Sequence, residues 1–205
     1  MLAQWLPHHA PDAAAGQALA LRFFEGYGGD WSEFDRGTVE RDDLASRIAR
    51  RTGLTRDEAL MVIDGVPAAL TPIDGTVGLL RRLHDAGHPL YFLSNMPAPY
   101  ASHLEAVHDF VGLFRAGVFS SRVQMLKPEP QIYAHALDHF GIAAADTIFI
   151  DDLERNVDAA RAAGWRALHF TSPEACEAEL IRLGCLAESP ERGSARRAED
   201  FAHGF

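Results

Sequence analysis

The sequence has 205 residues, a length that fits one domain with a small insertion. Its 47% hydrophobic and 23% charged residues are the balance of an ordinary globular protein, and its net charge of -10 argues against nucleic acid or an anionic membrane surface as a partner. No apolar run approaches the roughly 18 residues of a membrane span, and the first residues lack the basic start of a signal peptide. The two cysteines, Cys176 and Cys185, predict reduced thiols in a cytoplasmic protein.

The first third of the chain carries helical patterns. Three segments combine apolar residues at helical spacing with a Gly or Pro stop: 13–27, 39–51 and 56–70. Pro67 and Pro72 then mark a boundary. We therefore expect residues 1–72 to form a helical region.

From Asp74 onward, short apolar runs alternate with amphipathic helices. The expected strands are residues 89–93, 117–119, 147–150 and 165–170. The expected helices are residues 77–87, 100–110, 132–140 and 153–163. This alternation predicts a doubly wound, Rossmann-like α/β core with a parallel sheet over residues 73–187. Residues 188–205 are polar and predict a disordered tail.

Polar side chains follow three of the predicted strands. Ser94 and Asn95 follow the first, Lys127 stands in the loop after the second, and Asp151 and Asp152 follow the third. Ligands bind at the carboxyl ends of strands in open α/β sheets. A hydroxyl, an amide, a cation and a carboxylate pair suit a phosphoryl group bridged by Mg2+, because the carboxylates hold the metal and the other groups offset the phosphate charge.

These segments resemble the haloacid dehalogenase-like hydrolase superfamily. The resemblance is to the branch with a helical cap after the first strand and a double acid in its last motif, which includes sugar-phosphate phosphatases and the phosphatase domain of soluble epoxide hydrolases. The matching segments are 92–95, 127–133, 148–152 with Asn156, and 31–37 in the cap.

The resemblance implies a role for each matching residue. Ser94 and Asn95 would bind the transferring phosphoryl group, and Lys127 would stabilise its charge. Asp152 would ligate Mg2+ with Asp151 beside it. Asn156 would orient this loop from behind. The implied activity is Mg2+-dependent hydrolysis of small phosphate monoesters through an aspartyl-phosphate, with a small phosphorylated metabolite, such as a sugar phosphate, as substrate.

One part of the family pattern does not occur in this sequence. The family's nucleophile is an aspartate in an Asp-x-Asp motif that ends the first, central strand, and no apolar strand with that ending precedes residue 30. Asp74 and Asp64 follow apolar residues, but we interpret them as a helix N-terminal acid and a helical residue. We therefore expect the central strand to be missing between the strands that carry Ser94 and Asp151.

The missing strand leads to an expectation about the gene and about activity. A start assigned too late, or a truncated form, explains the pattern better than a strandless enzyme, because unpaired buried backbone groups each cost about 1–3 kcal/mol. The nucleophile would then lie upstream, and the chain as given would be inactive.

Two other functions are compatible with the same residues. One is a degenerate, non-catalytic family member that binds a phosphorylated ligand. The other is a 2-haloacid dehalogenase, against which the double acid argues because that reaction needs no metal. The sequence leaves the substrate and the oligomeric state open.

Overall fold

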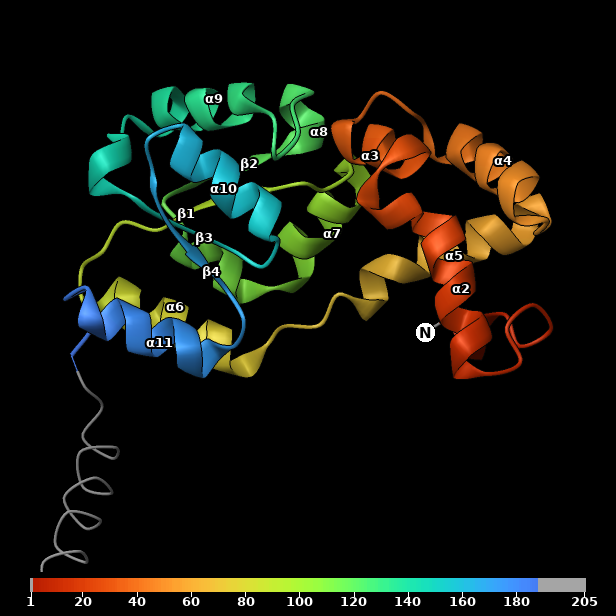
Figure 1. The fold of residues 1–205 in the computed structure, drawn as a ribbon, viewed down its shortest axis with the longest axis horizontal. Coiled ribbons are helices and arrows are strands. Elements are labelled where there is room, and N and C mark those ends of the chain that lie inside the picture. Colours follow the sequence, from red (N-terminus) through yellow and green to blue (C-terminus); the bar gives the residue numbers. More distant parts are fainter. Residues whose placement is uncertain (1, 188–205) are drawn as a thin grey trace, which may run out of the picture.

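The computed structural model describes residues 2–187 and contains a helical region and an α/β region (Figure 1). The helical region consists of α1 (Leu2–Trp5), α2 (Ala13–Phe24), η1 (Glu25–Tyr27), α3 (Gly29–Arg36), α4 (Arg41–Thr52) and α5 (Arg56–Ala69). Local capping sets several of these boundaries. Asp12 accepts a hydrogen bond from Ala15 N at the start of α2, and Thr55 forms a reciprocal capping box with Glu58 at the start of α5.

An aromatic cluster fills the core of the helical region where it meets the α/β region. Its members are Phe23, Phe24, Trp31, Phe34 and Tyr100, with neighbouring ring centroids 4.6–6.4 Å apart. Tyr100 belongs to α7 of the α/β region, and its hydroxyl donates to the Ile63 carbonyl of α5 at 2.6 Å. Burial of this ring raises the pKa of Tyr100 above its usual value. The two regions therefore share a packed, hydrogen-bonded contact.

The α/β region follows in alternating order. It consists of α6 (Asp74–Asp85), β1 (Tyr91–Ser94), α7 (Ala98–Val107), η2 (Asp109–Leu113), β2 (Ala116–Phe119), α8 (Ser120–Val123), α9 (Pro130–Phe140), η3 (Ala144–Asp146), β3 (Ile148–Asp151), α10 (Glu154–Ala162), β4 (Arg166–His169) and α11 (Pro173–Arg182). The four predicted strands and their parallel direction are confirmed. Helices α1, α3, α8 and α11 were not predicted as elements.

The strands form two separate parallel pairs rather than one sheet. Residues Tyr91–Ser94 of β1 pair with Ala116–Phe119 of β2, and Ile148–Asp151 of β3 pair with Arg166–His169 of β4. Within residues 2–187, no strand hydrogen-bonds to both β1 and β3. All four residues of β1 are only half-buried, whereas strands of complete parallel sheets are covered on both faces. The separation falls where the sequence predicted a missing strand.

Helices cover both faces of the strand layer. On one face, α9 and α10 pack on β3 through a cluster that includes Tyr133, Phe149 and Trp165. On the other face, α6 and α11 pack through Leu79, Leu83 and Leu180. Figure 1 shows these helix pairs above and below the strands. The helices that follow β1 and β2, α7 and α8, contact α5 and α3 of the helical region.

The two aspartates that we rejected as candidate nucleophiles lie on helices. Asp74 is the first residue of α6, and Asp64 lies within α5 and pairs with Arg41. Cys176 and Cys185 are free thiols. Between residues 2 and 187, no single helix is long and apolar enough to cross a membrane; α5 and α6 meet that criterion only as a pair bent by 48°. The expected tail, residues 188–205, lies outside the described residues.

Candidate active site

Lys127 is the centre of the site, and it is the only lysine in the sequence. Its Nζ lies 2.6 Å from Asp151 Oδ2, and the two side chains are only 11% and 5% exposed. The ammonium also lies 5.6 Å from the centre of the Phe149 ring. All other basic residues are arginines or histidines, so the single compact ammonium of the protein stands at the edge where the predicted site residues meet. The motif around Lys127 predicted its role from the sequence. That it is the only lysine in the sequence is a second indication, which the motif analysis did not use.

Asn95 fixes the backbone of Lys127. Asn95 Nδ2 donates to the Lys127 carbonyl at 2.9 Å, and Lys127 N donates to Asn95 Oδ1 at 2.9 Å. One N–H of the Asn95 amide remains for another acceptor. Ser94 ends β1 directly beside it, and its backbone is in register with Phe119. The carboxyl end of β1 is thus linked to the lysine loop by a two-bond clamp.

Asp151 is held by three donors in addition to its place at the end of β3. Lys127 contacts Oδ2, while Oδ1 accepts hydrogen bonds from Leu153 N and Asn156 Nδ2, both at 2.9 Å. Asn156 is 2% exposed, and its Oδ1 has no hydrogen-bond partner among the described residues. Tyr133 donates to the Asn156 carbonyl at 2.9 Å. Hydrogen bonds from Leu153 and Asn156, at the start of α10, therefore hold the Asp151 carboxylate in position.

Asp152 is exposed and its carboxylate makes no hydrogen bond to the described part of the chain. Its carbonyl oxygen lies 3.0 Å from His169 Nε2. No group of three His, Cys, Asp or Glu side chains converges within residues 2–187. Mg2+ commonly takes only one or two carboxylates and completes its shell with water and substrate phosphate. The free carboxylate of Asp152, with Asp151 next to it, fits one side of such a site.

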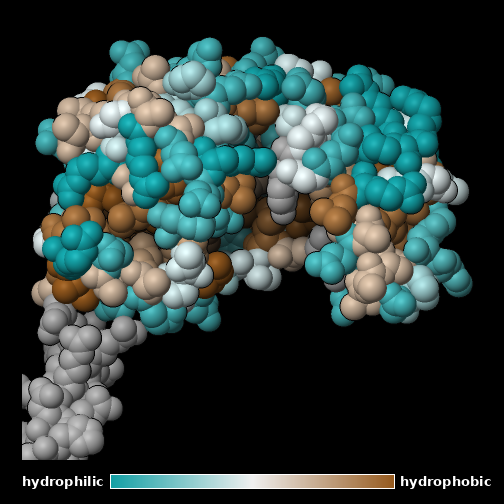
Figure 2. Space-filling model, viewed as in Figure 1, coloured by the Kyte–Doolittle hydropathy of each residue, from teal (hydrophilic) through white to brown (hydrophobic). Residues whose placement is uncertain are grey.

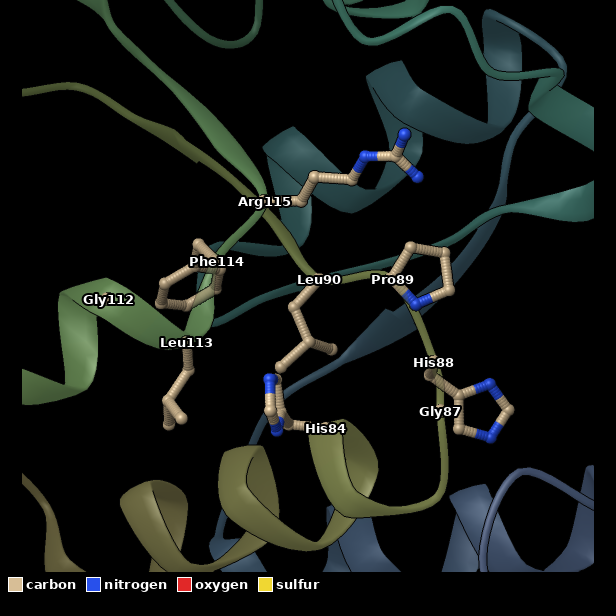
Figure 3. Close-up of a pocket in the computed structure, with 9 residues that line it drawn as sticks. All are labelled: His84, Gly87, His88, Pro89, Leu90, Gly112, Leu113, Phe114 and Arg115. Atoms are coloured by element: carbon tan, nitrogen blue, oxygen red, sulfur yellow. The ribbon is translucent and has the colours of Figure 1, made fainter.

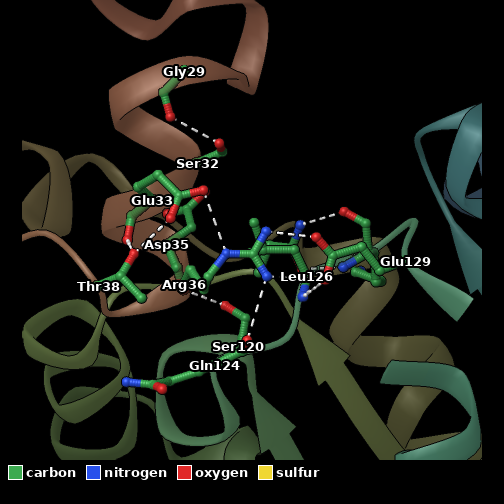
Figure 4. A network of polar contacts seen from close by, with 12 residues as sticks. Gly29, Ser32, Glu33, Asp35, Arg36, Thr38, Ser120, Gln124, Leu126 and Glu129 are labelled. Atoms are coloured by element: carbon green, nitrogen blue, oxygen red, sulfur yellow. Dashed lines mark hydrogen bonds and ion pairs between the residues drawn. The ribbon is translucent and has the colours of Figure 1, made fainter. Parts of the chain in front are cut away.

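Contacts from the helical region reach the same loop (Figure 4). Arg36, at the end of α3, forms two hydrogen bonds with Glu129, two residues beyond Lys127. Ser120 is fully buried; its hydroxyl donates to the Asp35 carbonyl at 2.5 Å and accepts from Met96 N at 2.8 Å. Sequence reasoning matched the segments that contain Asp35, Arg36 and Glu129 but assigned these residues no role.

Asp35 is an unusual member of this contact region. Its side chain is 8% exposed and has no hydrogen-bond donor among the described residues. Burial without a donor disfavours the charged carboxylate and raises the pKa of Asp35 to about 7. Asp35 therefore titrates near neutral pH at the junction of the two regions.

A cavity lies at the other end of the strands (Figure 3). It has a volume of about 460 Å³ and is lined by His84, by residues 87–90 before β1 and by residues 112–115 before β2. These residues precede the strands, whereas Ser94 and Asp151 end them. Its lining includes none of Ser94, Asn95, Lys127, Asp151 and Asp152, so the cavity is separate from the predicted site.

Comparison with known proteins connects this geometry to a family. A profile for haloacid dehalogenase-like hydrolases matches residues 13–164. The chain is 36% identical over 157 residues to the sesquiterpene phosphatase of Aspergillus oryzae, covering 76% of this chain and 80% of that protein. It is 25% identical over 168 residues to flavin mononucleotide hydrolase 1 of Arabidopsis thaliana, covering 78% of this chain and 64% of that protein.

Two solved structures share the fold. A variant of a HAD family enzyme from Bacteroides thetaiotaomicron, in complex with magnesium and inorganic phosphate, aligns with a TM-score of 0.61 at 20% identity and covers 76% of this chain and 82% of that one. The L-2-haloacid dehalogenase of Xanthobacter autotrophicus aligns with a TM-score of 0.62 at 20% identity and covers 91% and 78%. By its profile match and its 36% identical relative, the chain belongs to the haloacid dehalogenase-like hydrolase family.

Proposed function

We propose that the protein hydrolyses phosphate monoesters of small metabolites. The observation that carries this proposal is the hydrogen-bonded chain of Asn95, Lys127 and Asp151, which joins the carboxyl ends of β1 and β3. Ser94 ends β1 next to Asn95. A buried ammonium beside carboxylates and hydrogen-bond donors is suited to a transferring phosphoryl group, whose charge develops on its outer oxygens.

The residues of the site would divide the work as follows. The Ser94 hydroxyl and the remaining Asn95 N–H would donate to phosphoryl oxygens, and Lys127 would offset their charge. Asp152, with Asp151 beside it, would hold Mg2+, which when bound supplies a second positive charge against the phosphate. Asn156 would keep Asp151 in place by its hydrogen bond to Oδ1.

The nucleophilic aspartate would reach the site on a strand between β1 and β3. Within residues 2–187, β1 pairs only with β2 and β3 only with β4, yet Lys127 bridges the carboxyl ends of β1 and β3 through Asn95 and Asp151. A parallel strand placed there would end beside the lysine. Its terminal carboxylate would attack phosphorus, break the ester bond and release the alcohol, which leaves an aspartyl-phosphate. Water would then hydrolyse this intermediate to inorganic phosphate and the free carboxylate. In this proposal the nucleophile would come from outside residues 2–187.

A phosphate monoester with an apolar chain is a more specific candidate substrate than a sugar phosphate. The relative from Aspergillus oryzae is a sesquiterpene phosphatase. Figure 2 shows hydrophobic residues around the hollow between the α/β region and the helical region. An apolar lining would favour a terpenoid chain over a sugar, because burial contributes roughly 25 cal/mol per Å² of apolar surface.

Binding of inorganic phosphate tests the site without requiring turnover. Phosphate with Mg2+ should raise the melting temperature of the protein, since a ligand that binds only the folded state stabilises it. Lys127→Met and Asp152→Asn should remove most of this shift. Arg122→Gln, which breaks an exposed ion pair with Glu105, is the matched control and should retain it. No shift in the unmodified protein at millimolar phosphate would refute the proposed site.

A further inference from the structure

The guanidinium of Arg36 holds both ends of the loop that carries Lys127 (Figure 4). Nη1 donates to Glu129 Oε2 at 2.9 Å and Nη2 donates to Glu129 Oε1 at 2.5 Å, a two-pronged ion pair. Nη1 also reaches the Gln124 carbonyl at 3.3 Å. Glu129 Oε2 in turn accepts a hydrogen bond from Leu126 N at 3.2 Å. One side chain from the helical region thus fixes the loop on both sides of the lysine.

Three supports therefore act on Lys127, each from a different part of the fold. Asn95 at the end of β1 holds its backbone, and Asp151 at the end of β3 holds its ammonium. Arg36 is the support that comes from the helical region. Only Pro128 separates Lys127 from Glu129 in the sequence. A displacement of Glu129 would therefore move the backbone of Lys127 as well.

The end of α3 is itself firmly seated on the α/β region. The Asp35 carbonyl accepts a hydrogen bond from the hydroxyl of buried Ser120. Gly37 adopts a φ of +80° at a position where a Cβ would lie 2.7 Å from the Ser121 carbonyl oxygen. Arg36 lies between these two contacts in the sequence. They fix its backbone and so help to orient its guanidinium group toward Glu129. Ion pairing with Arg36 also lowers the pKa of Glu129.

We propose that Arg36 is a positioning residue for Lys127: through Glu129, the helical region sets where the ammonium lies relative to the bound phosphoryl group. This inference rests on the proposed role of Lys127 in phosphate binding. It gives the helical region a task beyond covering the site, because any shift of α3 changes the electrostatic centre of the site.

The single lysine allows a direct test on the full chain. Protein labelled with ¹³C-lysine gives one lysine side-chain signal, which reports the surroundings of Lys127, and inorganic phosphate with Mg2+ is the ligand. Arg36→Gln should move this signal toward the position of a solvated lysine and weaken phosphate binding about 10-fold, as loss of a supporting contact typically does. Arg36→Lys, which retains the charge without the fork, should give an intermediate result.

Arg41→Gln is the matched control. Arg41 also pairs through two nitrogens with a carboxylate, Asp64, but both residues belong to the helical region. Among the described residues, the side-chain hydrogen bonds of Arg41 go to Asp64 and Asp42 and not to the lysine loop. This variant should leave the lysine signal and the phosphate affinity unchanged. The exchanged pair Arg36→Glu with Glu129→Arg should recover part of the affinity.

The outcomes separate this inference from the proposed function. Equal lysine signals in Arg36→Gln and Arg41→Gln would overturn the positioning role. If the unmodified protein binds no phosphate, the proposed function fails, while the lysine signal still decides whether Arg36 positions Lys127. Should Arg36→Gln fail to fold, Arg36→Lys and Glu129→Gln carry the same comparison.

Discussion

At the residue scale, the junction of the two regions contains one acid in an environment that disfavours its charge. Asp35 is buried and receives no hydrogen bond on its carboxylate from the described residues. The neighbouring Ser120 hydroxyl donates to its backbone carbonyl instead. Such a group prefers to be neutral in the folded state and ionised in the unfolded state above about pH 4. The stability of the protein should therefore depend on pH through this residue.

The sign of that dependence follows from the raised pKa. The pKa of Asp35 is about 7 in the folded protein and near its ordinary value of 3.8 in the unfolded chain, so the folded state binds the extra proton between these pH values. Its contribution to stability is fully present below about pH 4 and is lost as the pH rises to 7. Asp35→Asn should flatten this slope and stabilise the protein at pH 8 by roughly 2–4 kcal/mol. Urea unfolding at pH 5 and pH 8 measures it; an unchanged slope would contradict the prediction.

Asn95 offers a second test at this scale. Asn95→Ala removes both hydrogen bonds to the Lys127 main chain and leaves a half-buried N–H and C=O without their partners. The free energy of unfolding should fall by roughly 1–3 kcal/mol, and phosphate binding should weaken as well. Chemical denaturation and calorimetric titration check the two effects. Ser102→Ala, which removes an exposed hydroxyl contact within α7, is the control and should change neither. Full phosphate affinity in Asn95→Ala would show that the clamp is dispensable.

Motif residues were the part of the site that the sequence could predict. Ser94, Lys127 and Asp151 follow apolar strands, and the rule that ligands gather at carboxyl ends of strands brings them together. The clamp of Asn95 on the Lys127 backbone was not predictable, because the side chain's partner lies 32 residues away and depends on loop geometry. The ion pair of Arg36 with Glu129 joins residues 93 positions apart and was not predictable for the same reason.

At the scale of elements, the structure shows why some segments were predicted and others missed. Helix α9 carries a long apolar stripe with Gly141 as its stop, and it begins and ends close to the predicted positions. Helix α3 starts at Gly29, a poor helix former, and is held by burial of Trp31 and Phe34 in the aromatic cluster. Packing rather than local preference thus decides α3, and α3 is the element that contacts the lysine loop.

The end of α3 gives a prediction with an internal control. Gly37 and Gly53 end α3 and α4 with φ values of +80° and +82°, but only a Cβ at Gly37 would meet a neighbour, the Ser121 carbonyl at 2.7 Å. Gly53→Ala should cost only the backbone strain, about 1–2 kcal/mol. Gly37→Ala should cost more and should also weaken phosphate binding, because it pushes α3 off the α/β region. Thermal unfolding and phosphate titration compare the two variants. Equal effects would argue against close packing of Gly37 on Ser121.

At the scale of the whole molecule, the strand layer of the described residues is divided between β1 and β3. The two pairs β1–β2 and β3–β4 are individually regular, and helices cover both faces, yet β1 and β3 have no common neighbour within the described residues. The alternating pattern predicted the strands and the class of fold. Pairing between distant strands was predictable only from the family resemblance, because periodicity alone does not give strand order.

This division predicts the catalytic behaviour of the chain as given. It should hydrolyse p-nitrophenyl phosphate no faster than its Asp152→Ala variant, because covalent catalysis requires a nucleophile that residues 2–187 do not place at the site. A steady-state assay with and without Mg2+ measures this. Robust Mg2+-dependent turnover by the unmodified chain would show that one of its own carboxylates attacks phosphorus.

The most direct test of the central claim is a crystal structure of the protein grown with magnesium and inorganic phosphate. The account predicts a phosphate within hydrogen-bond distance of Ser94 Oγ and Lys127 Nζ, with a magnesium ion between it and Asp152. Phosphate bound only elsewhere, or an empty edge at saturating concentration, would contradict the claim that this edge is a phosphoryl site.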